Sequence, residues 1–263
     1  MKKKNDLCIH PTSIIGKNVS LGKGTYIGPQ ATIHDNVSIG EHCNIGPRVT
    51  IGEPGPQYYS SDDYEFPPTY IGENSIIRSG TVIYNGCRFG QYLRTGHYAV
   101  IRENTIAGDH CSFGTYANID GDCELGNYVR IHYLAHVCKK AKIGNYVWIY
   151  PYSLLTNDIH PPCNMCMDGP TIEDYAVVTV HCVVMPRVRI GKHALVAANS
   201  VVTCDVPANT IVAGTPAKER GLVSDIRCDF EGLVETPYPW PTHLKQGYPW
   251  ENTTWDDSED STK

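Results

Sequence analysis

A bulky, mostly aliphatic residue recurs at every sixth position through most of this chain. The series stops after Ile51 and again after Leu155, and each time it resumes with the same period. A helix requires a period of 3.6 residues and a flat sheet a period of two, so a period of six indicates short strands joined by sharp turns in a parallel β-helix. The repeat residues are Ile9, Ile15, Leu21, Ile27, Ile33, Ile39, Ile45, Ile51, Ile71, Ile77, Ile83, Phe89, Thr95, Ile101, Ala107, Phe113, Ile119, Leu125, Ile131, Val137, Ile143, Ile149, Leu155, Ile172, Val178, Val184, Ile190, Val196 and Val202.

The period also predicts the size of the β-helix and its corners. With strands of about five residues and about 4.8 Å per coil, the repeats predict roughly nine to ten triangular coils and a length of about 45 Å. Glycine follows many repeat residues and is expected to supply the φ freedom of a tight corner. These glycines are Gly16, Gly22, Gly28, Gly40, Gly46, Gly52, Gly72, Gly90, Gly108, Gly126, Gly144 and Gly191.

Five of the 11 cysteines share one phase of the repeat, four residues after a repeat position. Small or β-branched residues occupy this phase elsewhere, so these thiols are predicted to be small buried hydrophobes without a metal or redox role. The CxxC pair Cys163 and Cys166 has no second pair nearby, which disfavours zinc and redox chemistry there. The five repeat cysteines are Cys43, Cys87, Cys111, Cys123 and Cys182.

Charge and hydropathy exclude several classes of protein. With 22 basic and 28 acidic residues and a net charge of −6, the chain lacks the basic excess of a nucleic-acid or membrane-surface protein. No apolar run approaches the roughly 20 residues that a membrane helix needs. Lys2 to Lys4 are followed by Asn5 and Asp6 rather than by an apolar segment, so no secretory signal and a cytoplasmic location are predicted.

Two segments interrupt the repeat, at residues 53–70 and 156–171, and both are rich in Pro, Asp and other polar or aromatic residues. Loops that leave a rigid scaffold are where recognition usually takes place. The domain prediction is a β-helix over residues 1–218 that carries these two loops. Residues 219–263 are predicted to form a tail whose aromatic part packs on the β-helix and whose acidic end is disordered.

Residues 18 apart stack on one face when a coil has three hexapeptides, so the corners sort into three columns. The first column is glycine from residue 72 to residue 144 and is predicted to be structural. The second column and its flanking positions carry His97, His132 and Tyr133. The third has no glycine in its leading position, and a ladder of polar side chains there suits a charged, polyhydroxylated ligand. The alternative is a solvated charged edge in which Glu103 pairs with Lys139 or Arg102.

Residues 190–218 read IGKHALVAANSVVTCDVPANTIVAGTPAK. This segment resembles the terminal coils of hexapeptide-repeat acyltransferases, which are left-handed β-helices that form trimers with active sites between subunits. The resemblance implies acetyl-CoA as co-substrate, no metal, and a homotrimer. A thin pantetheine arm needs a groove without bulky side chains and with free backbone donors. The residues implied for the coenzyme are Ala197, Ala198, Asn199, Ser200, Gly214, Pro216 and Lys218.

The middle of the chain resembles the nucleotide-sugar N-acetyltransferases that acylate amino-dideoxy sugars on dTDP or UDP. The segments concerned are Tyr84-Asn85, Thr95-Gly96-His97, Val100-Ile101-Arg102-Glu103, Ile119-Asp120-Gly121 and Leu155-Thr156-Asn157-Asp158 with His160. The resemblance implies transfer of acetyl to a 3-amino or 4-amino deoxysugar for a surface glycan such as the O-antigen of lipopolysaccharide. The chain departs from the family pattern at Gly121 and Lys139, where a polar side chain and an acid are expected.

Three residues are implied as catalytic, His97, His132 and Asn85. Corners of one coil are separated by roughly 17 Å if the strand between them has about five residues, so His97, His132 and Tyr133 are expected to face the third corner of a neighbouring chain. A histidine can accept the amine proton, and His160 is a further candidate. The coenzyme sulfur can also accept it. The residues implied for substrate binding are Tyr84, Arg102, Glu103, Asp120, Tyr133, Lys139, Asn157 and His160.

Three other functions are alternatives, and each requires a feature of its own. An O-acetyltransferase has the same scaffold and requires a firmly held base for a hydroxyl acceptor. A γ-type carbonic anhydrase requires three zinc-bound histidines, and His132 and His136 are close in sequence, but the coenzyme-like terminal coils have no purpose in it. A binding or ice-binding prism requires a regular Thr or Ser array, which no corner shows.

Overall fold

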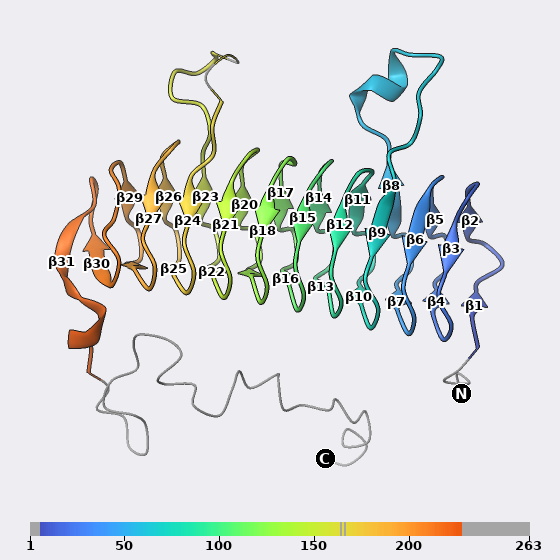
Figure 1. Ribbon diagram of the computed structural model, residues 1–263, viewed down its shortest axis with the longest axis horizontal. Coiled ribbons are helices and arrows are strands. Elements are labelled where there is room, and N and C mark those ends of the chain that lie inside the picture. The colour runs from blue at the N-terminus through green and yellow to red at the C-terminus, as the bar shows by residue number, and fades with distance from the viewer. Residues whose placement is uncertain (1–5, 164, 166, 228–263) are drawn as a thin grey trace.

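The computed structural model describes residues 6–163, 165 and 167–227. This part of the chain winds into a parallel β-solenoid with three sheets, named sheets A, B and C (Figure 1). Sheet A contains β1 (Cys8–Ile9), β4 (Tyr26–Ile27), β7 (Asn44–Ile45), β10 (Ile76–Ile77), β13 (Arg94–Thr95), β16 (Ser112–Phe113), β19 (Arg130–Ile131), β22 (Trp148–Ile149), β25 (Val177–Val178), β28 (Leu195–Val196), β30 (Thr210–Ala213) and β31 (Lys218–Leu222).

Sheet B contains β2 (Ile14–Ile15), β5 (Thr32–Ile33), β8 (Thr50–Glu53), β11 (Val82–Tyr84), β14 (Val100–Ile101), β17 (Asn118–Ile119), β20 (His136–Val137), β23 (Leu154–Leu155), β26 (Val183–Val184) and β29 (Val201–Val202). Sheet C contains β3 (Ser20–Leu21), β6 (Val37–Ile39), β9 (Thr69–Ile71), β12 (Arg88–Phe89), β15 (Ile106–Ala107), β18 (Glu124–Leu125), β21 (Lys142–Ile143), β24 (Thr171–Ile172) and β27 (Arg189–Ile190). Two short 3-10 helices, η1 (Pro56–Tyr59) and η2 (Val223–Asp225), complete the described elements.

The fold class predicted from the period of six is confirmed, and the solenoid is consistent with a left-handed β-helix. Each predicted repeat residue lies in one of the strands β1 to β29, and residues 18 apart pair in register, as Val82 does with Val100. The predicted strand length was wrong, because most ladders pair only two residues and the corners take the rest of each hexapeptide. The coil count was also too low, since β30 continues sheet A and β31 covers it in the antiparallel direction.

The repeat residues from Ile27 to Val202 fill the interior together with small residues, as predicted, whereas Ile9 and Ile15 in the first coil are exposed. The five repeat cysteines are all buried. Burial raises the pKa of Cys87 to about 12 and that of Cys111 to about 12, because a thiolate is poorly solvated there. The thiols are therefore protonated and behave as small hydrophobes.

The predicted reason for the corner glycines was wrong for all of them except Gly52, whose φ is +84°. Positive φ occurs two positions after the corner glycine instead, for example at Asn74 with φ 57° and Tyr92 with φ 59°. At Gly72 a Cβ atom would lie 2.3 Å from the backbone of Gly90 in the next coil. Glycine is needed there because the next coil passes too close for a side chain.

The positive-φ residues of successive coils stack on one another at the corner between sheets C and A. The rings of Tyr92 and His110 are 4.5 Å apart and within 10° of parallel, and the later contacts are 4.6 to 4.8 Å. This spacing follows the coil rise of about 4.8 Å, so the backbone ladder sets the ring separation. The stacked residues are Tyr92, His110, Tyr128, Tyr146, Tyr175 and His193.

Both loops leave the solenoid at the same corner. The first follows β8 and the second follows β23, and both strands belong to sheet B and lead to sheet C. Figure 1 shows the two loops projecting from the same side of the solenoid. The predicted behaviour of the tail concerns mainly residues 228–263, which lie outside the described residues. Among the described residues there is no helix with the length and apolar character of a membrane span.

We expect Gly72→Ala to destabilise the protein by about 1–3 kcal/mol, the usual cost of overpacking, because the added Cβ meets backbone rather than a movable side chain. Gly55→Ala is the matched control, since Gly55 has φ −73° and its Cβ would meet only the end of the Gln57 side chain. Thermal unfolding at a fixed protein concentration measures both. Equal midpoints for the two variants would show that coil approach does not select glycine at this corner.

Candidate functional site

The three corners are named by their order in a coil. The first corner joins sheet C to sheet A, the second joins A to B, and the third joins B to C. The third corner is the candidate site because both loops leave from it and because the charged ladder predicted from the sequence lies along it. The structure places seven predicted site residues along this corner, namely Tyr84, Asn85, Arg102, Glu103, Asp120, Lys139 and Asn157.

Charged side chains at the third corner pair with one another. Arg102 donates to both carboxylate oxygens of Glu103, with distances of 3.0 Å from Nε and 3.1 Å from Nη2. Lys139 Nζ lies 3.0 Å from Asp122 Oδ2 and 3.9 Å from Glu103 Oε1. The structure thus contains the ion pairs of Glu103 that the charged-edge interpretation requires. Asn157 extends the cluster, because its Nδ2 donates to the Lys139 carbonyl at 3.3 Å.

The first loop is attached to the third corner through Asn85. The Asn85 side chain is 2% exposed, and its Nδ2 donates to Tyr64 Oη. The same hydroxyl accepts from the Gly55 amide at 3.3 Å. The Tyr64 ring makes T-shaped, edge-to-face contacts with Tyr58 and Phe66 at this point. Asn85, expected to be catalytic, therefore has a structural contact that holds the loop over the corner.

A cavity of about 310 Å³ lies between the first loop and the corner. Glu53, Pro54, Pro56 and Tyr59 line it from the loop side, and Tyr84 and Arg102 line it from the corner. The Arg102 guanidinium carbon lies 5.4 Å from the centre of the Tyr84 ring. Aromatic faces, a fixed cation and a carboxylate are the groups that bind planar rings, phosphates and hydroxyls.

Asp120 contacts a histidine that the sequence analysis did not place in the site. His136 Nε2 lies 3.4 Å from Asp120 Oδ2. The pKa of Asp120 is lowered, first by hydrogen bonding with His136 and then by the charges of His136, Arg102 and Lys139, although burial opposes the shift. The sequence contained a signal for this contact, because His136 is 18 residues after Asn118. The two residues pair across the ladder, and Asp120, two residues after Asn118, therefore lies near His136.

The second corner carries the other predicted residues, and they do not meet the third corner within this chain. His97 is exposed and its Nδ1 is 2.7 Å from Ser79 Oγ. His132 stacks on Tyr150 at 4.5 Å. Burial and then the charge of Arg130 lower the pKa of His132 to about 4, and its Nε2 is buried without a hydrogen-bond partner among the described residues.

Tyr133 and His160 are both on the surface. Tyr133 is 46% exposed and contacts the edge of Tyr152 at 5.5 Å. His160 lies in the second loop, where its backbone amide donates to Asp158 Oδ1 at 3.0 Å. Its ring is therefore positioned by loop structure rather than by the coils.

The terminal coils have the small side chains that a coenzyme groove requires, but fewer free amides than predicted. The amides of Ala197 and Asn199 already donate to Val212 and Val180 carbonyls, at 2.9 Å and 3.0 Å. The prediction that these two amides are free donors was wrong, because the coil ladder uses them. Ser200 is fully buried and its hydroxyl joins Ala197 to Gly214, while Ala198, Pro216 and Lys218 are exposed.

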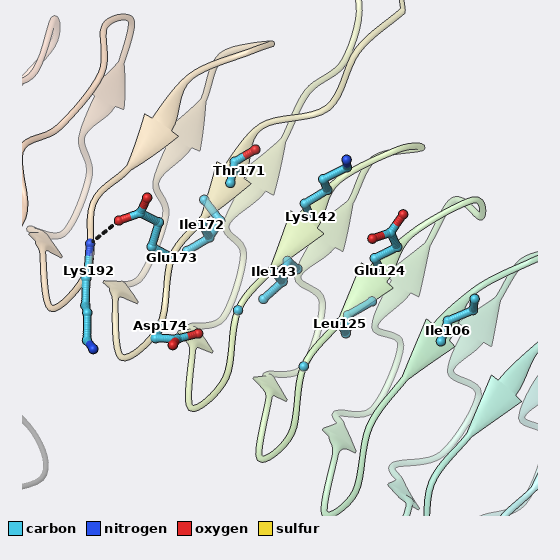
Figure 2. A pocket seen from close by; sticks show the side chains of 12 residues that line it. Ile106, Glu124, Leu125, Lys142, Ile143, Thr171, Ile172, Glu173, Asp174 and Lys192 are labelled. Carbon is cyan, nitrogen blue, oxygen red and sulfur yellow. Dashed lines mark hydrogen bonds between the residues drawn. The ribbon is translucent and has the colours of Figure 1, made fainter.

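A larger hollow of about 670 Å³ lies on sheet C, beside the first corner that was predicted to be purely structural. Figure 2 shows Ile106, Glu124, Lys142 and Thr171 as side chains of neighbouring strands in this hollow. At its end the Lys192 amide donates to Glu173 Oε2 at 2.8 Å. The hollow is broad and open, and none of its lining residues belongs to the predicted site. No group of three or more His, Cys, Asp and Glu side chains able to hold a metal occurs in the part of the chain that the structure describes.

Comparisons with known proteins agree with the repeat. Residues 18–53 match the family described as bacterial transferase hexapeptide (six repeats). Over 84 residues, 32% of this chain and 34% of the relative, the sequence is 39% identical to 2,3,4,5-tetrahydropyridine-2,6-dicarboxylate N-acetyltransferase of Staphylococcus aureus strain bovine RF122 / ET3-1. The same enzyme of strain JH9 is 38% identical over the same length. The match spans about a third of the length of these relatives.

Among solved structures, Arabidopsis UDP-N-acetylglucosamine acyltransferase is similar with a TM-score of 0.56. The sequences are 23% identical, and the similarity covers 82% of this chain and 73% of that chain. This likeness supports the fold.

The lowered pKa of Asp120 predicts a pH-dependent contribution to stability. A carboxylate with a depressed pKa in the folded state stabilises the fold above its ordinary pKa of about 3.9 and loses that contribution as the pH falls through the folded-state value. We expect Asp120→Asn to be less stable than the parent by about 0.2–1 kcal/mol near pH 7. The difference should shrink as the pH falls below about 3.9 toward the lower folded-state pKa.

Thermal midpoints from pH 3 to pH 7 test this expectation. Asp62→Asn is the control, because Asp62 is an exposed loop carboxylate, and its effect should stay within about 0.5 kcal/mol at every pH. A constant Asp120→Asn difference across the whole pH range would contradict the assigned cause.

Proposed function

We propose that this chain is a hexapeptide-repeat acyltransferase that transfers an acetyl group from acetyl-CoA to the amino group of a nucleotide-linked 3-amino or 4-amino deoxysugar. The observation that carries the proposal is the third corner. There the first loop, which projects from the solenoid, lines one side of a cavity whose other side is formed by Tyr84 and Arg102, and the second loop leaves from the same corner. The product would serve surface glycan synthesis.

The cavity suits the acceptor in its chemistry. Arg102 can also hold a phosphate of the diphosphate, through a guanidinium N–H other than the Nε and Nη2 groups that bind Glu103. Tyr59 is 76% exposed and, with Tyr84, offers ring surface to a base or a sugar. Glu103 and Asp120 would accept hydrogen bonds from sugar hydroxyls or the amine. Lys139, where the resemblance leads us to expect an acid, neutralises Glu103 and Asp122 instead.

The coenzyme is proposed to lie along the second corner. Ala197 and Ala198 belong to that corner in the terminal coils, in the same column as His132 and Tyr133. Small side chains leave room for the pantetheine arm, and Lys218 is an exposed cation beside Gly214 and Pro216. An acetyl group carried along this corner would approach His132 and Tyr133.

A neighbouring subunit is proposed to join the two corners into one site. Sheet B lies between the second and third corners, and the first residues of its ten strands include no Asp, Glu, Lys or Arg. In sheet C the corresponding residues include Arg88, Glu124, Lys142 and Arg189. An uncharged face beside two polar corners fits an interface of a closed trimer. His97, His132 and Tyr133 of one chain would then face the third corner of the next.

The first test is a turnover screen with acetyl-CoA. Acceptors are dTDP- and UDP-linked 3-amino and 4-amino deoxysugars, matched sugars with a hydroxyl in place of the amine, and an amino dicarboxylate, since the two relatives are dicarboxylate N-acetyltransferases. Turnover is expected only with the nucleotide-linked amines. Acetylation of the hydroxyl or dicarboxylate compounds alone would contradict the proposal.

Arg102→Met tests the acceptor cavity. The loss of a charge-assisted hydrogen bond costs about 1.5–3 kcal/mol, so we expect KM for the nucleotide sugar to rise roughly 10- to 150-fold. The KM for acetyl-CoA should change little. Arg88→Met is the matched control, because Arg88 also lies over a tyrosine, at 4.5 Å from the Tyr70 ring centre, but on sheet C. Similar kinetics for Arg102→Met and Arg88→Met would place the acceptor elsewhere.

A further inference from the structure

We propose that His136, held by Asp120, is the catalytic base that takes the proton from the acceptor amine. This inference rests on the proposed function and adds a residue that the sequence resemblance did not supply. The pair is formed by side chains of adjacent coils, with His136 Nε2 at 3.4 Å from Asp120 Oδ2.

The position of His136 suits a base beside the acceptor corner. His136 is the first residue of β20 on sheet B, so it lies on the uncharged face between the second and third corners. The His136 and Asp120 side chains are 33% and 36% exposed, which leaves them accessible without losing their contact.

The distance to the acceptor cavity is also suitable. Arg102 follows β14 and His136 lies in β20, two coils further along the solenoid. At about 4.8 Å per coil the two residues are about 10 Å apart along the axis. A phosphate held at Arg102 therefore places the far side of a hexose ring, where a 3-amino or 4-amino group lies, toward His136.

The three histidines predicted from the sequence are poorer bases in this structure. Burial lowers the pKa of His132 to about 4, so the ring binds a proton weakly near neutrality. His97 Nδ1 is engaged with Ser79 Oγ at 2.7 Å. His160 lies on a loop outside the coils. Within the described residues, His136 is the one of these four histidines whose ring pairs with a carboxylate, and Asp120 can stabilise the imidazolium that forms.

Charged groups act on Asp120, whereas uncharged side chains flank His136 in the ladder. Asp120 faces the charges of His136, Arg102 and Lys139. The ladder neighbours of His136 are Asn118 and Leu154, which carry no charge. The net effect favours an ionised Asp120 carboxylate, whose pKa is lowered by these partners, and hence a fixed anion beside the imidazole.

The reaction transfers the acetyl group to the amine nitrogen and one amine proton to the coenzyme sulfur. The amine nitrogen forms a bond to the thioester carbonyl carbon, and His136 Nδ1, the nitrogen not paired with Asp120, accepts a proton from that nitrogen. The carbon–sulfur bond then breaks and the electron pair leaves on the coenzyme sulfur. His136 returns its proton to that sulfur, so the products are the amide and free CoA thiol, and Asp120 stays ionised throughout.

His136→Asn tests the proposal in the intact protein. General-base catalysis contributes about 10²–10⁴-fold, so we expect kcat to fall at least 100-fold, with affinity for CoA unchanged and the acidic limb of the kcat profile abolished. His42→Asn is the matched control. His42 is also paired with a carboxylate, at 3.8 Å from Glu41 Oε2, but lies at the first corner, and its variant should keep parental kinetics.

Asp120 is a positioning residue in this scheme. Asp120→Asn should lower kcat less than His136→Asn and should shift the acidic limb of the profile rather than abolish it. The double variant should be no slower than His136→Asn, because two residues of one unit do not add. Full additivity of the two losses would show that Asp120 does not act through His136.

Outcomes separate this inference from the proposed function. If the parent acetylates nucleotide-linked amines and folded His136→Asn retains kcat and the acidic limb, the base assignment is wrong while the function stands. If the parent acetylates none of the acceptors, both are wrong. Thermal midpoints of the variants identify any loss of activity that comes from unfolding, and His136→Gln provides a second substitution if His136→Asn does not fold.

Discussion

The structure depends on the backbone ladder that joins each coil to the next. Parallel pairing fixes the coil rise at about 4.8 Å and places every residue above the one 18 positions earlier. This spacing excludes a side chain at Gly72, where a Cβ would lie 2.3 Å from the next coil. It also stacks the rings from Tyr92 to His193 at the first corner and aligns Arg102 with Asp120 at the third.

Much of the fold could be predicted because the ladder requires a bulky inward residue at every sixth position, which is visible in the sequence. The period placed every repeat residue in a strand and identified five of the six cysteines that are buried among the described residues, missing Cys138. It did not reveal the role of glycine, because the close contact at Gly72 is made by a coil 18 residues away, while positive φ falls on residues such as Asn74. The strand length was overestimated because only two residues per hexapeptide pair in most ladders.

The candidate site was predicted in part for the same reason. Grouping corner residues that are 18 apart into columns collects the third-corner residues correctly. The columns contain corner residues only, so they omit a side chain in a strand, such as His136. Contacts between loop and corner, such as Asn85 with Tyr64, are not periodic and leave no signal in the repeat. Nor did these columns reveal the hollow on sheet C, where the apolar Ile106 is exposed among charged residues.

Two faces of the solenoid, sheets B and C, differ in charge. The first residues of the sheet C strands include charged side chains, whereas those of the sheet B strands include no Asp, Glu, Lys or Arg, and sheet B lies between the two proposed functional corners. The proposed site therefore needs two copies of the chain, one supplying the coenzyme corner and the other the acceptor corner.

A crystal structure with CoA and the acetylated nucleotide sugar tests this two-chain site most directly. The account predicts CoA against Ala198 of one subunit and the nucleotide sugar between Tyr84 and Arg102 of its neighbour. Either ligand bound instead in the sheet C hollow between Lys142 and Lys192, or both bound within one chain, would contradict it.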